Sequence, residues 1–167
     1  MKHILPILTI TTLAAAASAQ TAVAPAGLSY NRVTVSREGQ NNALSAEALL
    51  GSSNVLATIG TSTAGTSYSL GYVFKNVAFG VDATLSVGAG DKNAYSTYSV
   101  TLRRTLSEVI QGLEARIQVA QNDGDTTRAK TDATYELQYN ITKQYALAYS
   151  LNDGGNKAHT ISFRYNF

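Results

Sequence analysis

Apolar and polar side chains alternate along most of the chain after residue 27, and this pattern constrains the fold more than any other feature of the sequence. In the last segment, Ile161, Phe163 and Tyr165 fall on one face, while Ser162 and Arg164 fall on the other. A period of two places successive side chains on opposite faces of a β-strand, whereas an amphipathic helix repeats every ~3.6 residues. The sequence therefore predicts an all-β protein.

Nine short clusters of Gly, Asn, Asp, Ser, Thr and Lys interrupt the alternation, and such clusters are typical of turns between strands. They fall at 36–42, 51–54, 63–66, 75–76, 88–93, 106–108, 122–127, 142–143 and 152–157. Nine breaks define ten segments. Ten membrane strands of roughly 9–11 residues, with their turns, fill about 140 residues. Eight strands are possible but would leave two alternating segments unexplained.

Composition limits the function classes. Charged residues make up 14% of the chain, the formal net charge is +2, and there is no Cys. A disulfide framework and a thiolate metal site are therefore excluded, and so is the strongly basic surface of a nucleic-acid binder. The polar faces carry mostly Gly, Ala, Ser, Thr, Asn and Gln, which suits a narrow enclosed interior better than a solvated surface.

The first residues are predicted to be a targeting segment. Lys2 precedes an apolar run over 4–17, which is too short to be read as a spanning helix. A small-x-small motif then places cleavage between Ala19 and Gln20. We expect a signal peptide over 1–19, a short linker over 20–27 and one barrel domain over 28–167.

Two architectures fit an alternating all-β chain: a soluble β-sandwich and a membrane β-barrel. The odd-numbered connections read as long and the even-numbered ones as tight, which is the outer-membrane pattern. Aromatic residues gather near segment ends, among them Tyr30 and Phe79 beside short turns and Tyr68 and Tyr149 nearer long connections. Two such girdles favour an antiparallel up-and-down transmembrane β-barrel. The exported soluble sandwich stays an alternative.

The end of the chain is the most specific feature. Phe167 is the last residue, with Tyr165 and Phe163 behind it on the same face of an alternating segment. This arrangement resembles the C-terminal assembly signal of bacterial outer-membrane proteins. It implies the outer-membrane assembly machinery and outer-membrane lipid as partners, and the bacterial outer membrane as the location.

The first segment carries a second resemblance. Leu28-Ser29-Tyr30-Asn31-Arg32-Val33 is similar to the Leu-Ser-Tyr-Asn-Tyr-Val opening of a group of small outer-membrane β-barrels from proteobacteria. Arg32 stands where the group has its second Tyr, and the alternation changes phase near this residue, which suggests a bulge. The group implies a ten-strand outer-membrane barrel and no settled catalytic activity.

Charged residues on the polar faces are the candidate functional site. They are Glu47, Asp82, Arg103, Glu114, Arg116, Glu136 and Arg164. Paired inside a barrel, they would form a salt-bridged plug in a protein with a structural or surface-interaction role. Alternatively, they would form the constriction of a small-solute channel. Small barrels of about eight strands are filled by side chains, so ten strands favour the plug.

Little in the sequence indicates catalysis. His159 is the single His after the expected cleavage site, and no acid or Ser neighbour singles it out. Asp123, Asp125 and Asp132 lack the spacing and the bidentate Glu of a calcium loop. We predict no enzymatic activity, no cofactor and no metal, with a barrel enzyme as the least favoured alternative.

Replacing Phe167 with Asp is expected to impair assembly far more than an Asp placed in a loop such as 51–54. The substitution removes both the expected assembly signal and an aromatic side chain at the membrane interface. Folded protein in the membrane fraction can be measured by the gel-mobility shift on boiling. Wild-type yields of folded Phe167→Asp protein would contradict the assembly role.

Overall fold

The computed structural model describes residues 28–63, 65–91, 93–122, 130–154 and 157–167. The expected signal peptide, the Ala19–Gln20 cleavage site and the linker 20–27 lie outside these ranges. The described residues form ten strands and no helix. No helix in this part of the chain is long and apolar enough to cross a membrane.

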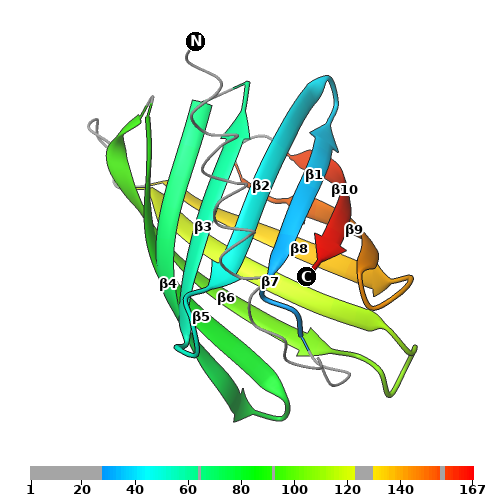
Figure 1. Cartoon of the computed structure of the whole chain (residues 1–167). Coiled ribbons are helices and arrows are strands. Elements are labelled where there is room, and N and C mark those ends of the chain that lie inside the picture. Colours follow the sequence, from blue (N-terminus) through cyan, green and yellow to red (C-terminus); the bar gives the residue numbers. More distant parts are fainter. Residues whose placement is uncertain (1–27, 64, 92, 123–129, 155–156) are drawn as a thin grey trace.

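The ten strands are antiparallel and close into one barrel, in which each strand pairs with its neighbours in sequence and β1 pairs with β10 (Figure 1). Their bounds are β1 Arg32–Glu38, β2 Asn41–Leu49, β3 Val55–Ser62, β4 Gly65–Ala78, β5 Val81–Gly90, β6 Asn93–Thr105, β7 Leu113–Asn122, β8 Lys130–Asn140, β9 Tyr145–Asn152 and β10 Ala158–Asn166. The predicted all-β class, barrel topology and strand count of ten are confirmed. We call the end where β1 begins and β10 finishes the terminal end, and the opposite end the far end.

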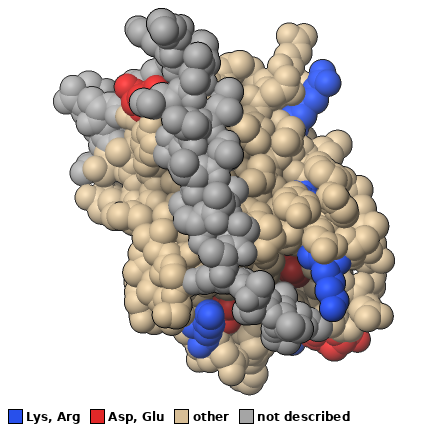
Figure 2. All heavy atoms as spheres, in the orientation of Figure 1, with Lys and Arg blue, Asp and Glu red and all other residues tan. Residues whose placement is uncertain are grey.

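Alternation along the strands separates an apolar exterior from a polar interior. Leu85 and Ile117 point outward and are 51% and 43% exposed, whereas the inward-pointing Thr84 and Thr101 are each 5% exposed. The face drawn in Figure 2 is mostly uncharged where it is described, with Lys, Arg, Asp and Glu in a few separate groups. In a soluble β-sandwich the apolar side chains pack between two sheets. Here they lie on the exterior of the barrel, which is the opposite arrangement.

One turn lies elsewhere than predicted. The sequence places a turn at 75–76, but β4 continues to Ala78 and the two-residue turn is Phe79-Gly80. Both turn residues have positive φ, at 49° and 73°, as a two-residue hairpin turn of type I′ requires. Asn76, also at positive φ, belongs instead to a register shift between Phe74 and Ala78.

The predicted loop asymmetry is wrong. The odd-numbered connections at 39–40, 63–64 and 91–92 have two residues each, whereas the even-numbered connection at 106–112 has seven. Pairing of β3 with β4 continues to Ser62↔Gly65, so residues that read as loop in the sequence are strand in the structure. Loop length therefore does not distinguish the two ends of the barrel.

The first strand has no phase change. Arg32 and Thr34 point inward and are buried, Val35 points outward, and the pairing of β1 with β2 and β10 is continuous. Tyr30 precedes the strand on the same inward side and is also buried. The predicted bulge near Arg32 and the assignment of Tyr30 to an exterior girdle are therefore both wrong.

Whether a side chain points outward or inward predicts how much a charged substitution at that position destabilises the barrel. In protein folded into lipid vesicles, Ile117→Arg is expected to lower the free energy of unfolding by roughly 2–4 kcal/mol. Ser150→Arg should cost less, because Ser150 points inward and is paired in register with Glu136. Urea titrations followed by circular dichroism compare the two variants. The opposite ranking would mean that the two faces are exchanged.

Candidate functional site: a plug and a cavity inside the barrel

Large charged side chains meet inside the barrel near the terminal end, because each occupies an inward position of its strand. They are Arg32 on β1, Glu47 on β2, Arg103 on β6, Glu114 and Arg116 on β7, Glu136 on β8 and Arg164 on β10. Arg32, Arg103 and Arg164 are 2%, 4% and 3% exposed. Charges this deeply buried are tolerated where they are paired and hydrogen-bonded.

Three of the arginines form ion pairs with the glutamates. Arg32 Nε lies 2.6 Å from Glu47 Oε1. Arg103 Nη2 lies 3.2 Å from Glu114 Oε2, and its Nη1 lies 3.7 Å from the same Glu47 oxygen. Arg164 binds Glu136 through two nitrogens, at 2.8 Å and 2.6 Å, which is the bidentate arrangement that gives the strongest pairs.

Two amides join these pairs into one network. The Gln138 Oε1 atom accepts hydrogen bonds from both Arg32 and Arg164. Gln138 also donates to Asn140 Oδ1 at 2.8 Å, and Asn140 donates to Glu114 Oε1 at 2.7 Å. The network therefore runs without a break from β1 and β2 across the interior to β6, β7, β8 and β10.

The segment before β1 crosses the same level of the barrel. Ser29 accepts a hydrogen bond at 2.9 Å on its carbonyl oxygen from Arg103, a residue of β6, which is five strands from β1 in either direction. The Tyr30 hydroxyl donates to Asp82 Oδ2 at 2.7 Å, and the Arg103 guanidinium lies 4.7 Å from the centre of the Tyr30 ring. Segment 28–31 is thus fixed to the opposite wall.

Tyr30 also packs on apolar side chains inside the terminal end. Its ring clusters with Leu56 and with Val73, which is fully buried, while Leu28 and Leu49 pack against them. Burial and the hydrogen bond to Asp82 raise the pKa of the Tyr30 hydroxyl, so it stays a donor at neutral pH. We call this cluster, segment 28–31 and the ion network together the plug.

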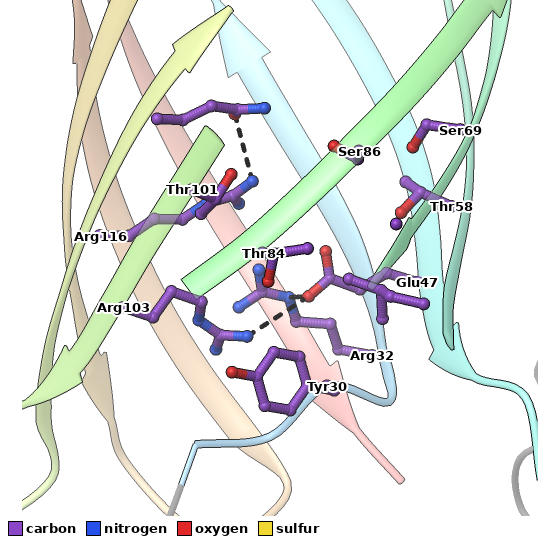
Figure 3. Close-up of a pocket in the computed structure, with 13 residues that line it drawn as sticks. Tyr30, Arg32, Glu47, Thr58, Ser69, Thr84, Ser86, Thr101, Arg103 and Arg116 are labelled. Carbon is purple, nitrogen blue, oxygen red and sulfur yellow. Dashed lines mark hydrogen bonds and ion pairs between the residues drawn. The ribbon is translucent and has the colours of Figure 1, made fainter. Parts of the chain in front are cut away.

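A polar cavity of about 90 Å³ lies against the plug on the side toward the far end (Figure 3). Tyr30, Arg32, Glu47 and Arg103 form its floor, and Arg116 lies on one wall. Hydroxyls line much of the remainder, from Thr58, Ser69, Thr84, Ser86 and Thr101. Gly71 completes the wall, where a Cβ atom would come within 2.9 Å of Ser86 Cβ.

Five of the seven predicted charges take part in ion pairs, and two do not. Asp82 binds the Tyr30 hydroxyl and accepts a second hydrogen bond from the Asn76 backbone at 2.8 Å, so it stabilises the irregular end of β4. Arg116 donates to Gln118 Oε1 at 3.2 Å and has no ion pair with any described carboxylate. The predicted pairing of both residues is therefore wrong.

Sequence reasoning missed Arg32, Tyr30 and the two amides. Arg32 lies two residues before Thr34 and so falls on the same face of β1. This spacing was the signal that could have placed Arg32 inside the barrel. No comparable signal exists for Tyr30, because its position depends on how segment 28–31 turns into the barrel.

The other predicted site residues lie on the exterior. Phe163 and Tyr165 point outward on β10, with the Tyr145 ring 5.8 Å and 5.5 Å from theirs. The Phe167 backbone N–H donates to the Asn31 carbonyl at 3.0 Å, which extends the contact between the two chain ends. His159 also lies outside, with its Nδ1 atom 2.5 Å from the Tyr149 hydroxyl.

No group of three His, Asp or Glu side chains within the described ranges is placed to hold a metal ion. Asp123 and Asp125 lie outside those ranges. The polar side chains of the described interior carry guanidinium, carboxylate, amide and hydroxyl groups, which bind ions and polar solutes.

A closed antiparallel barrel with a polar interior and an apolar exterior is the architecture of transmembrane β-barrels. Two solved structures share the fold: "KdgM porin", with a TM-score of 0.53, and "KdgM porin in complex with disordered oligogalacturonate", with a TM-score of 0.52. Each is 12% identical to this chain, and each comparison covers 82% of this chain and 98% of the other. No protein-family model and no curated protein matches the sequence.

Removing the Tyr30 hydroxyl tests the contact across the barrel. Tyr30→Phe is expected to lower the free energy of unfolding by roughly 1.5–3 kcal/mol, because the lost hydrogen bond has a charged acceptor. Tyr135→Phe, at an exposed exterior position, is the matched control and should change stability by less than about 0.5 kcal/mol. Urea unfolding followed by circular dichroism measures both, since the chain has no Trp. Equal effects would contradict a structural role for the Tyr30–Asp82 contact.

Proposed function

We propose that this protein is an outer-membrane β-barrel whose interior is closed by the plug, and that its role is structural or surface-interacting rather than that of an open pore. The observation that carries the proposal is the unbroken Arg–Glu–amide network from β1 and β2 to β6, β7, β8 and β10. A solute that passed along the barrel axis would have to separate buried ion pairs.

The exterior supports the location in a membrane. Apolar side chains on β4 to β10 remain exposed although the barrel is closed, and only an apolar medium would cover them. Aromatic side chains such as Phe74, Tyr139, Tyr145 and Tyr165 lie outward toward the terminal end, where an aromatic girdle is expected. An even number of strands leaves both chain ends on one side, which we assign to the periplasm.

The ion network supports a closed barrel, because separating its buried ion pairs would cost a large free energy. Separating Arg164 from Glu136, or Arg103 from Glu114, would leave an uncompensated charge in a confined space. Breaking a buried pair by removing one partner typically costs about 3–5 kcal/mol. Three such pairs, two of them linked through Glu47 and Arg103, make a plug that does not open by thermal fluctuation of single side chains.

A small-solute channel is the second candidate. It is favoured by the porin fold and by the cavity beside the plug, where three arginines face one glutamate. One similar structure is a porin in complex with oligogalacturonate, an acidic saccharide. If this barrel does conduct, an excess of guanidinium groups would favour acidic solutes.

Conductance in planar lipid bilayers separates the two candidates. The wild-type barrel is expected to show little or no steady current. Arg103→Ser removes the contacts with Ser29, Glu47 and Glu114 and should produce small currents, because the guanidinium that joins β2, β6, β7 and segment 28–31 is lost. Each preparation is first checked for folding by the gel-mobility shift on boiling.

Arg104→Ser is the matched control, since Arg104 is the next residue, points outward and pairs with Glu108 at 2.5 Å outside the plug. Arg104→Ser should show no more current than the wild type. Large stable currents from the wild type would overturn the plug and establish the channel. If Arg103→Ser does not fold, Tyr30→Ala replaces it, and silence from a folded plug variant would show that this plug is not what closes the barrel.

A further inference from the structure

The cavity beside the plug has an excess of positive charge. Arg32, Arg103 and Arg116 reach it, and Glu47 is the one acid among its described lining residues. Arg32 is paired with Glu47 at 2.6 Å, and Arg103 has Glu114 at 3.2 Å. Arg116 is therefore the one of these three arginines that has no ion pair with a described carboxylate.

The neighbours of Arg116 in the sheet explain why it has no ion pair with a carboxylate. On one side its register partner is Arg103, which is also a cation. On the other side its partner is Glu136, but that carboxylate is held by Arg164 at 2.6 Å. The contact that remains is the neutral oxygen of Gln118, at 3.2 Å.

Arg116 and Arg103 each carry a hydrogen-bond donor that has no acceptor. Arg116 Nε and Arg103 Nη1 are buried atoms without a hydrogen-bond partner, although Arg103 Nη1 is 3.7 Å from Glu47. A buried donor that lacks an acceptor typically costs about 1–3 kcal/mol, and more when the group is charged. An anion in the cavity would place negative charge beside both guanidinium groups, which line it.

We propose that this cavity binds a small inorganic anion, of the size of chloride or bromide, held by the Arg116 guanidinium and nearby hydroxyls. A volume of about 90 Å³ admits such an ion with a few waters, but not an extended acidic saccharide. Thr84 and Thr101 line the same space and supply hydroxyl donors. The site depends on the barrel interior alone and does not require that the barrel be closed or that it conduct.

The test is thermal unfolding of the full-length barrel in detergent, followed by circular dichroism. Sodium chloride is compared with sodium gluconate at equal ionic strength, because gluconate is too large for the cavity. Ligand binding to the folded state raises the unfolding midpoint by mass action. We expect a saturable rise with chloride concentration in the wild type.

Two variants remove the positive excess at Arg116 by different routes. Arg116→Gln removes the cation, and Gln118→Glu places a permanent carboxylate where Arg116 already donates. Both should abolish the chloride-dependent shift, while Gln118→Glu should also raise the midpoint in gluconate. Arg104→Gln, on the exterior, is the control and should keep the wild-type shift.

An equal chloride-dependent shift in Arg116→Gln, Gln118→Glu and the control would overturn the proposal, and so would the absence of a shift in the wild type. If the interior variants do not fold, crystals of the wild type soaked in sodium bromide decide the question by anomalous scattering. A bromide within hydrogen-bonding reach of Arg116 supports the site, and bromide confined to the exterior rules it out. Bilayer currents do not enter this test, so the anion site and the plug can fail independently.

Discussion

Pairing of β1 with β10 is the constraint on which the rest of the structure depends, because it joins the two ends of the sheet and removes its free edges. Six residue pairs, from Arg32↔Asn166 to Arg37↔Ile161, make this seam. Closing ten strands fixes an interior narrow enough for side chains to reach from wall to wall. The seam also leads segment 28–31 into the terminal end, where Tyr30 meets β5 and β6.

Charge compensation inside that narrow space then decides which side chains meet. On sequence alone the interior has four acids and three arginines, a slight negative excess. In the structure Asp82 is held by Tyr30 and by the irregular end of β4, whereas Arg32 joins the interior. Four arginines therefore share the interior with three glutamates and with Asp82, whose charge the neutral Tyr30 hydroxyl does not cancel. The positive excess is local: Arg116 has no ion pair with a described carboxylate, and three arginines and one glutamate line the cavity beside it.

The parts of the fold that could be predicted are those that depend on local pattern. A period of two is a property of each strand by itself, so strand count and the facing of residues such as Thr84 and Ile117 follow from sequence. Turn positions depend on competing backbone choices: Lys75-Asn76 resembles a turn, but the positive φ values needed for a two-residue hairpin occur at Phe79-Gly80. Contacts across the barrel, such as Arg103 with Ser29, depend on strand stagger and on the path of segment 28–31.

The same fold can enclose an open path or a closed one, because passage depends on the side chains at one level and not on the course of the backbone. Here the large inward residues Tyr30, Arg32 and Arg103 lie toward the terminal end, while Ser69 and Ser86 beyond them are small. The described interior is therefore a cavity with a floor rather than a uniform tube. Binding and passage are separate properties in such a barrel: under the two proposals above, an ion would reach Arg116 without separating the Arg–Glu pairs, but it would have to separate them to continue past Tyr30.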